Sequence, residues 1–174
     1  MTRYRIYPDD HLAHATRAEL LAWMAAERAD LQAQLTGLDE RILCQQPITA
    51  GGWTAKDLLA HVAHWDAFFA RSVALALEGR AGEVPDVSLD ERNAVVHAER
   101  QTWPLDAVLA ELAAARAGFL EVFSAAPDDA LDIEWQFGWG RATLRRIAKW
   151  RGTHDSEHAT QIEVMREQER QVHD

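Results

Sequence analysis

The sequence predicts an all-α protein built as a four-helix bundle. Four long segments repeat apolar residues at spacings of three and four, which is the pattern of an amphipathic helix. No segment shows a convincing two-residue alternation of the kind that indicates a β-strand. The chain has 174 residues, of which 48% are hydrophobic. We therefore expect a single domain over residues 1–174, with its core at about 16–168.

The first helix is expected over about Thr16–Thr36, with Gly37 after it as a C-cap. Its apolar stripe consists of Leu20, Leu21, Met24, Leu31 and Leu35. A loop that contains Pro47 and two glycines then separates it from the second helix.

The second helix is expected to open at Thr54 and to end near Gly79. Residues 54–57, Thr-Ala-Lys-Asp, have the form of a capping box. Its apolar face is formed by Leu58, Val62, Trp65, Phe69 and Val73. At about 100° per residue, His61 falls on the flank of that face and His64 lies further round, so His61 is the expected inward histidine.

A connection with glycine and proline and then a short helix at about 90–101 lead to the third long helix, whose first turn is expected to contain Pro104. Its predicted apolar face, which ends near Ala125, is Leu105, Val108, Leu109, Leu112, Phe119, Leu120 and Phe123. The tryptophan-rich segment DIEWQFGWG that follows is predicted to be a loop.

The last helix is expected over about Ala142–Gln168. Its inward series is Leu144, Ile147, Ala148, Arg151, His154, Asp155, His158, Ile162 and Met165. His158 falls near the middle of this stripe, and His154 falls at its edge.

Three histidines, His61, His154 and His158, therefore lie on or beside apolar stripes, where an imidazole needs a partner. His154 and His158 are one helical turn apart, and a third histidine from a facing helix would complete a three-nitrogen site with open positions, as in catalytic metal sites. Nitrogen ligands suit Zn, Ni, Fe or Cu. The HxxxH spacing alone is weak evidence, and no glutamate follows the first histidine as in the HExxH metalloproteases. The alternative is that other side chains or trapped water satisfy these imidazoles.

Several neighbours of the predicted triad have two interpretations each. Asp155 could orient a ligand histidine or form a buried ion pair with Arg151. His64 could be exposed or could support a ligand. Trp65, Trp135 and Trp139 could line a pocket or serve as core residues, and His97 could reach the same pocket.

Composition and charge exclude or disfavour several classes of function. A net charge of −10 disfavours nucleic-acid binding, because a polyanion would be repelled. Cys44 is the only cysteine, so no intramolecular disulfide is possible, and we expect it to be a small buried hydrophobe. No apolar stretch approaches the length of a membrane span, and the N-terminus lacks the apolar region of a secretory signal. The expected location is the cytoplasm.

Two motifs resemble those of the DinB/YfiT-like superfamily. GGWTAKDLLAHVAHWD, residues 51–66, is similar to its helix-2 motif, and HDSEHATQI, residues 154–162, is similar to its closing HxxxH helix. The middle of the chain, residues 89–131, and the segment EWQFGWGR resemble the DfsB/ClbS-type branch. The resemblance covers about Thr16–Met165.

This resemblance implies a long crossover between helices 2 and 3, consistent with the connection at 79–103, and a metal held by His61, His154 and His158. Members include metal-dependent thiol transferases, an isomerase that uses a low-molecular-weight thiol, and hydrolases of reactive small molecules, and dimers are common. The ClbS-type branch includes a self-resistance protein that opens an electrophilic cyclopropane, and its members need not keep the histidine triad. This chain keeps the triad.

We therefore expect a protein that binds a divalent metal ion (Zn, Ni or Fe) and acts as a hydrolase or thiol transferase on a small electrophilic or thiol-linked molecule, in detoxification or resistance. A low-molecular-weight thiol would be the second cofactor, and a homodimer is expected from the resemblance. One alternative is a binding protein that sequesters a toxic small molecule. Another is a bundle in which the metal only joins two helices.

Overall fold

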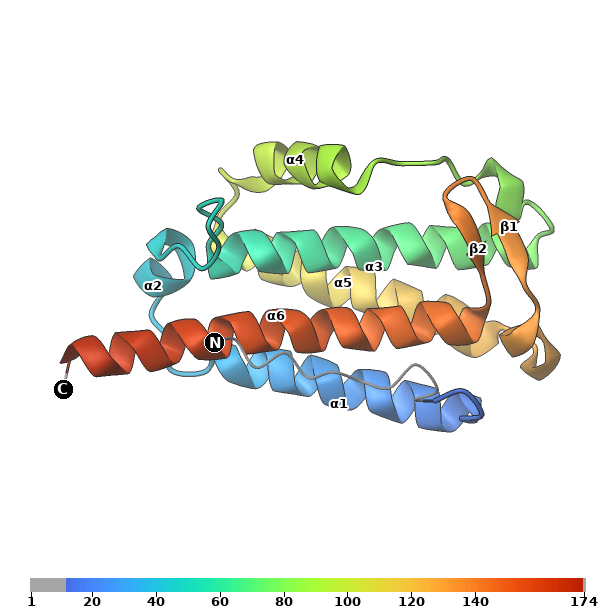
Figure 1. Ribbon diagram of the computed structural model, residues 1–174, viewed down its shortest axis with the longest axis horizontal. Coiled ribbons are helices and arrows are strands. Elements are labelled where there is room, and N and C mark those ends of the chain that lie inside the picture. The colour runs from blue at the N-terminus through green and yellow to red at the C-terminus, as the bar shows by residue number, and fades with distance from the viewer. Residues whose placement is uncertain (1–11, 174) are drawn as a thin grey trace.

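The computed structural model describes residues 12–173, and its long helices lie along a common direction (Figure 1). These bundle helices are α1 (Arg17–Leu35), α3 (Ala55–Leu77), α5 (Leu105–Ala125) and α6 (Leu144–His173). Helix α3 packs mainly on α5, and α1 packs mainly on α6. The predicted all-α four-helix bundle is confirmed.

The second and third bundle helices run parallel, and this arrangement requires a long connection between them. Near the start of α3, the Nζ atom of Lys56 donates to the carbonyl of Trp103, just before α5, at 2.9 Å. Near the C-terminal ends of α1 and α6, the side chain of Arg166 in α6 donates to the backbone carbonyl of Gln34 in α1 at 2.8 Å. Helix α4 (Leu89–Arg100) returns the chain along the outside of the bundle in Figure 1. The predicted crossover is therefore confirmed.

The start of α3 is fixed by the predicted capping box. The hydroxyl of Thr54 accepts from the backbone N–H of Asp57 at 3.3 Å, and the Asp57 carboxylate accepts from the backbone N–H of Thr54 at 2.9 Å. A second box, formed by Thr16 and Glu19, starts α1. Each box satisfies backbone donors that a helix start otherwise leaves without partners.

The tryptophan-rich segment is a small β-hairpin and not the predicted loop. Strand β1 (Trp135–Phe137) pairs antiparallel with β2 (Gly140–Ala142). Strands of three residues are too short to show an alternating pattern in the sequence. In the turn, the N–H of Gly138 donates to the carbonyl of Val84 at 2.9 Å, and a Cβ at Gly138 would lie 2.4 Å from that oxygen. Glycine therefore allows the hairpin to dock against the segment after α3.

Smaller differences concern the helix ends and short helices. The short helix α2 (Glu40–Gln45) and the 3-10 turns η1 (Ala81–Glu83) and η2 (Asp128–Asp132) fall in segments without a clear period. Pro104 is the N-cap of α5, one residue before the turn predicted for it. Helix α6 starts at Leu144 because Ala142 pairs in the hairpin.

Two further outcomes concern predicted apolar residues. Leu109 is 38% exposed, so its predicted place on the apolar face of α5 is wrong: it lies one residue, or about 100°, from the buried Val108. Cys44 is half-buried and packs against the core around Leu31. Among the described residues, no helix is both long and apolar enough to cross a bilayer.

A layer of charged side chains separates two apolar cores. One core includes Phe119 and Phe123, and the other includes Leu31 and Ile162. Along each bundle helix, the charged residues fall between members of the two cores. We call five of the buried charged residues, to which all four helices contribute, the buried charge layer: Arg28, Asp66, Arg116, Arg151 and Asp155. A further buried carboxylate, Glu27, precedes Arg28 on α1 and is not counted in this layer.

Candidate metal centre

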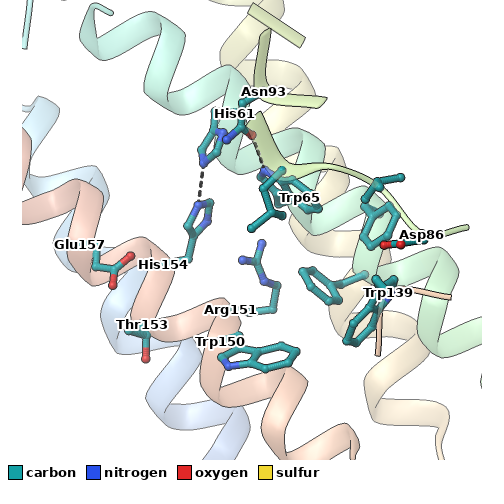
Figure 2. Close-up of a pocket in the computed structure, with 14 residues that line it drawn as sticks. His61, Trp65, Asp86, Asn93, Trp139, Trp150, Arg151, Thr153, His154 and Glu157 are labelled. Carbon is teal, nitrogen blue, oxygen red and sulfur yellow. Dashed lines mark hydrogen bonds between the residues drawn. The ribbon is translucent and has the colours of Figure 1, made fainter. Parts of the chain in front are cut away.

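The three histidines predicted to share a metal ion meet between α3 and α6. The Nε2 atom of His154 lies 2.8 Å from Nε2 of His61 and 3.1 Å from Nε2 of His158 (Figure 2 shows the first pair). One nitrogen of each ring lies within 4.8 Å of the other two, so the group could hold a metal ion. Two nitrogen ligands of a tetrahedral zinc ion are about 3.3 Å apart. The two short separations are close to that value.

His158 is held with one particular nitrogen toward the other two rings. Its Nδ1 lies 2.7 Å from Oε1 of Gln161, an oxygen that can only accept, so Nδ1 has the proton. The Nε2 atom of His158 is then unprotonated and presents its lone pair to His154. A histidine whose far nitrogen is fixed by such a hydrogen bond is the usual arrangement of a metal ligand.

Hydrogen bonds among neutral rings cannot satisfy both short contacts at once. If Nε2 of His154 has a proton, it can donate to His158 but leaves the contact with His61 unsatisfied. If it has a lone pair, it can accept from His61 but faces the lone pair of His158. A cation between the rings removes the conflict, because all three nitrogens can then present lone pairs. The donor set therefore fits a metal ion on its own chemistry.

Burial keeps these rings neutral. Loss of solvation lowers the pKa of His61 to about 3 and that of His158 to about 4, and it lowers the pKa of His154 well below its ordinary value. The positive charge of Arg151 contributes to each of these three shifts. At pH 7 the imidazoles are uncharged, and the uncharged ring is the form that binds a metal.

A pocket of about 460 Å³ opens beside His61 and His154. This volume is within the usual range for small-molecule sites. Its apolar wall contains Trp65, Phe68, Phe69, Trp139 and Trp150. Its polar groups include Asp86, Asn93, Arg151, Thr153 and Glu157 (Figure 2). His61 and His154 therefore lie at the border of a cavity large enough for an aromatic molecule.

Two of the four residues predicted for a pocket line it, and two do not. Trp65 and Trp139 are in its wall. Trp135 packs instead on the apolar core from strand β1. His97 stacks on Trp53 with ring centres 5.1 Å apart, and its Nε2 lies 3.6 Å from the Asp57 carboxylate, so it lies at the start of α3.

The two residues predicted to support the ligands have other contacts. The carboxylate of Asp155 accepts from Arg28 at 2.9 and 3.0 Å and from Arg116 at 2.5 Å, and among the described residues only arginines donate to this carboxylate. The predicted pair with Arg151 is replaced, because Arg151 lies 3.5 Å from Asp66. His64 is half-buried with its ring 5.5 Å from that of Trp65.

Sequence reasoning missed three residues around the site. Gln161 follows His158 by three residues, so a signal was present in the HxxxHxxQ spacing, one turn apart on α6. Asn93 comes from α4 and accepts from the indole N–H of Trp65 at 3.0 Å. Trp150 lies in the pocket wall although it is outside the predicted inward series. Nothing local in the sequence indicates these last two, because they depend on how α4 and the hairpin cover the bundle.

Comparison with known proteins agrees with this fold. The sequence profile of the DinB superfamily matches residues 24–162. The mycothiol-dependent maleylpyruvate isomerase superimposes with a TM-score of 0.74 at 20% identity, covering 87% of this chain and 62% of that one. This chain thus spans less than two thirds of the length of the isomerase. No curated protein matches the sequence.

Two further structures are similar. YfiT from Bacillus subtilis, described as a probable metal-dependent hydrolase with an unusual four-helix bundle topology, has a TM-score of 0.70 at 15% identity over 97% of this chain and 93% of that one. TT2238, described as a four-helix bundle protein, has a TM-score of 0.55 at 27% identity over 83% and 95%. The resemblance to the DfsB/ClbS-type branch stays a prediction.

Proposed function

The chain belongs to the DinB superfamily, and on that premise we propose that it binds a divalent metal ion at His61, His154 and His158 and acts on a small electrophilic or thiol-linked molecule. The main support is the convergence of three neutral imidazoles, two of which, His61 and His154, line an aromatic pocket. Three nitrogen ligands leave coordination positions open, as in catalytic zinc sites. When bound, a divalent ion supplies Lewis acidity and makes a water or thiol nucleophile available at neutral pH.

The remaining residues have separate parts in this proposal. Gln161 holds His158 in the form that presents Nε2. Asn93 fixes the indole of Trp65, which closes one side of the pocket. Trp139 and Trp150 form another part of the wall, with ring centres 5.8 Å apart. These surfaces would hold the apolar body of a substrate and exclude water from the reacting group.

Hydrolysis and thiol transfer are the two reaction classes that we propose. The description of YfiT as a probable metal-dependent hydrolase supports the first. The mycothiol-dependent isomerase supports the second, with a low-molecular-weight thiol as the other cofactor. Both classes need the same three ligands, so products must be identified from a panel of electrophiles with and without thiol. The proposed setting is detoxification or resistance.

Metal analysis of the purified protein tests the site. Wild type is expected to contain about one equivalent of Zn, Ni or Fe, and the variants His154→Ala and His158→Ala are expected to lose it, because each removes one of three ligands. The matched control is His64→Ala, which removes a histidine one turn along α3 from His61 and should keep the metal. A wild-type protein that takes up none of these ions on reconstitution would rule out the proposal.

A second candidate function is binding without chemical conversion. The aromatic wall around a cavity of about 460 Å³ favours it, because such a surface can hold an apolar compound without a metal. Product analysis separates the two functions. Protection in proportion to the amount of protein, with the compound recovered unchanged, would support sequestration, whereas turnover that is lost in the triple alanine variant of the histidines would support the enzyme.

A further inference from the structure

Four of the five groups in the buried charge layer neutralise one another. Arg28 donates to Asp66 at 2.7 Å and to Asp155 at 2.9 and 3.0 Å. Arg116 lies 3.1 Å from Asp66 through Nε and 2.5 Å from Asp155 through Nη2. Two guanidinium groups are thus shared between two carboxylates, and these four side chains have no net charge.

Arg151 is the fifth group and is left with little compensation. Its closest described carboxylate oxygen belongs to Asp66, which lies 3.5 Å from Nη1 and already binds the other two arginines at shorter distances. Its Nε is buried with no hydrogen-bond partner among the described residues. The residue is only 3% exposed. A guanidinium keeps its proton at neutral pH, so the layer retains one positive charge.

This undercompensated charge faces the pocket next to His61 and His154. Arg151 is one of the residues that line the cavity, and Figure 2 shows its guanidinium between His154 and the aromatic side chains. Its Cζ lies 4.8 Å from the ring centre of Phe69, so its flat face packs on the apolar wall. It is also near enough to His61, His154 and His158 to lower the pKa of each.

A buried cation without a full partner is costly, and an anion in the adjacent cavity would compensate it. We propose that Arg151 binds a carboxylate group of the ligand, with the aromatic wall holding a flat apolar body attached to it. A guanidinium matches the two oxygens of a carboxylate with two parallel hydrogen bonds. The inference rests on the proposed function in that it names the substrate class of the same pocket.

The acidic residues of the pocket limit the ligand to a single negative charge. Asp86 and Glu157 are both exposed on its lining. A second carboxylate pointing outward would meet these two charges and be repelled. We therefore expect an aromatic or otherwise apolar monocarboxylate, oriented with its acid group toward Arg151.

The test compares 1-naphthaleneacetate with 1-naphthaleneacetamide, which has nearly the same shape and no charge. Isothermal titration calorimetry measures binding of each compound to the metal-free and the zinc-loaded protein, residues 1–174. Wild type is expected to bind the acid about tenfold or more tightly than the amide in both states, because charge-assisted hydrogen bonds are strong in a desolvated site. In Arg151→Met the preference is expected to fall to within about twofold.

Two further variants make the comparison specific. Arg146→Met removes the same charge five residues earlier on α6, from an exposed guanidinium outside the pocket, and should keep the preference. Arg151→Lys keeps the positive charge but lacks the planar guanidinium, so it should retain part of the preference for the acid over the amide. Arg151→Met is expected to fold, because it removes an undercompensated buried charge. Its melting temperature is measured alongside wild type.

Three results would overturn the inference: wild type binds neither probe, wild type binds both equally, or Arg151→Met keeps the full preference for the acid. If Arg151→Met keeps the full preference for the acid only in the zinc-loaded protein, the carboxylate binds to the zinc ion and not to Arg151. Failure of the proposed metal site gives a different result. In that case wild type takes up no zinc, while the acid preference of the metal-free protein still depends on Arg151.

Discussion

At the scale of single residues, Gln161 does most to prepare the histidine site. Its Oε1 accepts the Nδ1 proton of His158 at 2.7 Å, whereas the Nδ1 atoms of His61 and His154 are buried without a partner among the described residues. The sequence predicted the three histidines from their helical phase. It did not predict Gln161, although the HxxxHxxQ spacing places this residue one turn from His158 on the same helix.

Replacing Gln161 by leucine is expected to weaken metal binding by about 10–100-fold, because the ring of His158 would lose its fixed orientation and proton position. Competition with a chromogenic chelator measures the affinity. Gln168→Leu is the matched control, since Gln168 is exposed on the same helix. Equal affinity in wild type and Gln161→Leu would show that this hydrogen bond does not influence the metal site.

His64 gives a prediction for pH dependence. Burial, and after it the charges of Arg100 and Arg92, lowers its pKa to about 4 from the ordinary value of 6.5. Between pH 6.5 and 4 the unfolded chain binds a proton that the folded chain does not, so the contribution of His64 to stability is lost as the pH falls through this window. The effect is reduced by the partial exposure of the ring.

We therefore expect His64→Gln to lose less melting temperature than wild type between pH 7 and pH 5, with a difference of roughly 2–4 °C, or about 1 kcal/mol. The comparison uses metal-free protein, so that a metal ion does not compete with protons for the other histidines. Parallel Tm curves for the two proteins would contradict the prediction.

At the scale of elements, the approach of α6 to α1 depends on a glycine within a helix. A Cβ at Gly152 would lie 2.3 Å from the ring of Trp23, which packs on the core from α1. Real Cβ atoms do not come so close to a rigid ring, so one of the two helices would have to move. Periodicity marked residues 142–168 as a helix, but it could not show which neighbour this position faces.

Gly152→Ala is expected to reduce the free energy of unfolding by about 1–3 kcal/mol, because the added methyl group overpacks the contact with Trp23. The control is Gly118→Ala in α5, where an added Cβ meets no atom within 4 Å. That variant is expected to gain about 0.5–1 kcal/mol, since alanine is the better helix former. Urea unfolding measures both, and a gain in both variants would show that Trp23 moves aside easily.

At the scale of the whole molecule, the buried charge layer joins all four bundle helices. Arg28 comes from α1, Asp66 from α3, Arg116 from α5, and Arg151 and Asp155 from α6. Each pair forms only when the helices have the observed position along the bundle, because an apolar core lies on either side. We infer that these pairs help to select one alignment of the helices, a known role of buried polar groups.

Asp155→Ala is expected to lower the free energy of unfolding of the metal-free protein by about 3–5 kcal/mol, because it leaves buried guanidinium groups uncompensated. The comparison is Asp132→Ala, which breaks the pair with Arg145 at 2.7 Å, where the aspartate side chain is 70% exposed. That loss should stay below about 1 kcal/mol. Similar losses in the two variants would show that burial does not determine the value of these pairs.

The four bundle helices, most of their buried faces and the inward direction of His61, His154 and His158 could all be predicted from the sequence alone. These features depend on local properties: apolar spacing, the Thr54 capping box, and glycine and proline at the ends of segments. Such interactions extend over a few residues, so they can be seen in the sequence without knowledge of the fold.

The partners of these residues depend on the packing of the helices and could not be predicted from the sequence. The sequence suggested Arg151 as a partner for Asp155. In the folded chain, Asp155 pairs with Arg28 and Arg116, and Arg151 faces the pocket. The hairpin likewise placed Trp139, and not Trp135, in the pocket wall. Residues far apart in the chain meet only through the crossover and the close approach of the helices. The local spacing of apolar residues contains no information about these contacts.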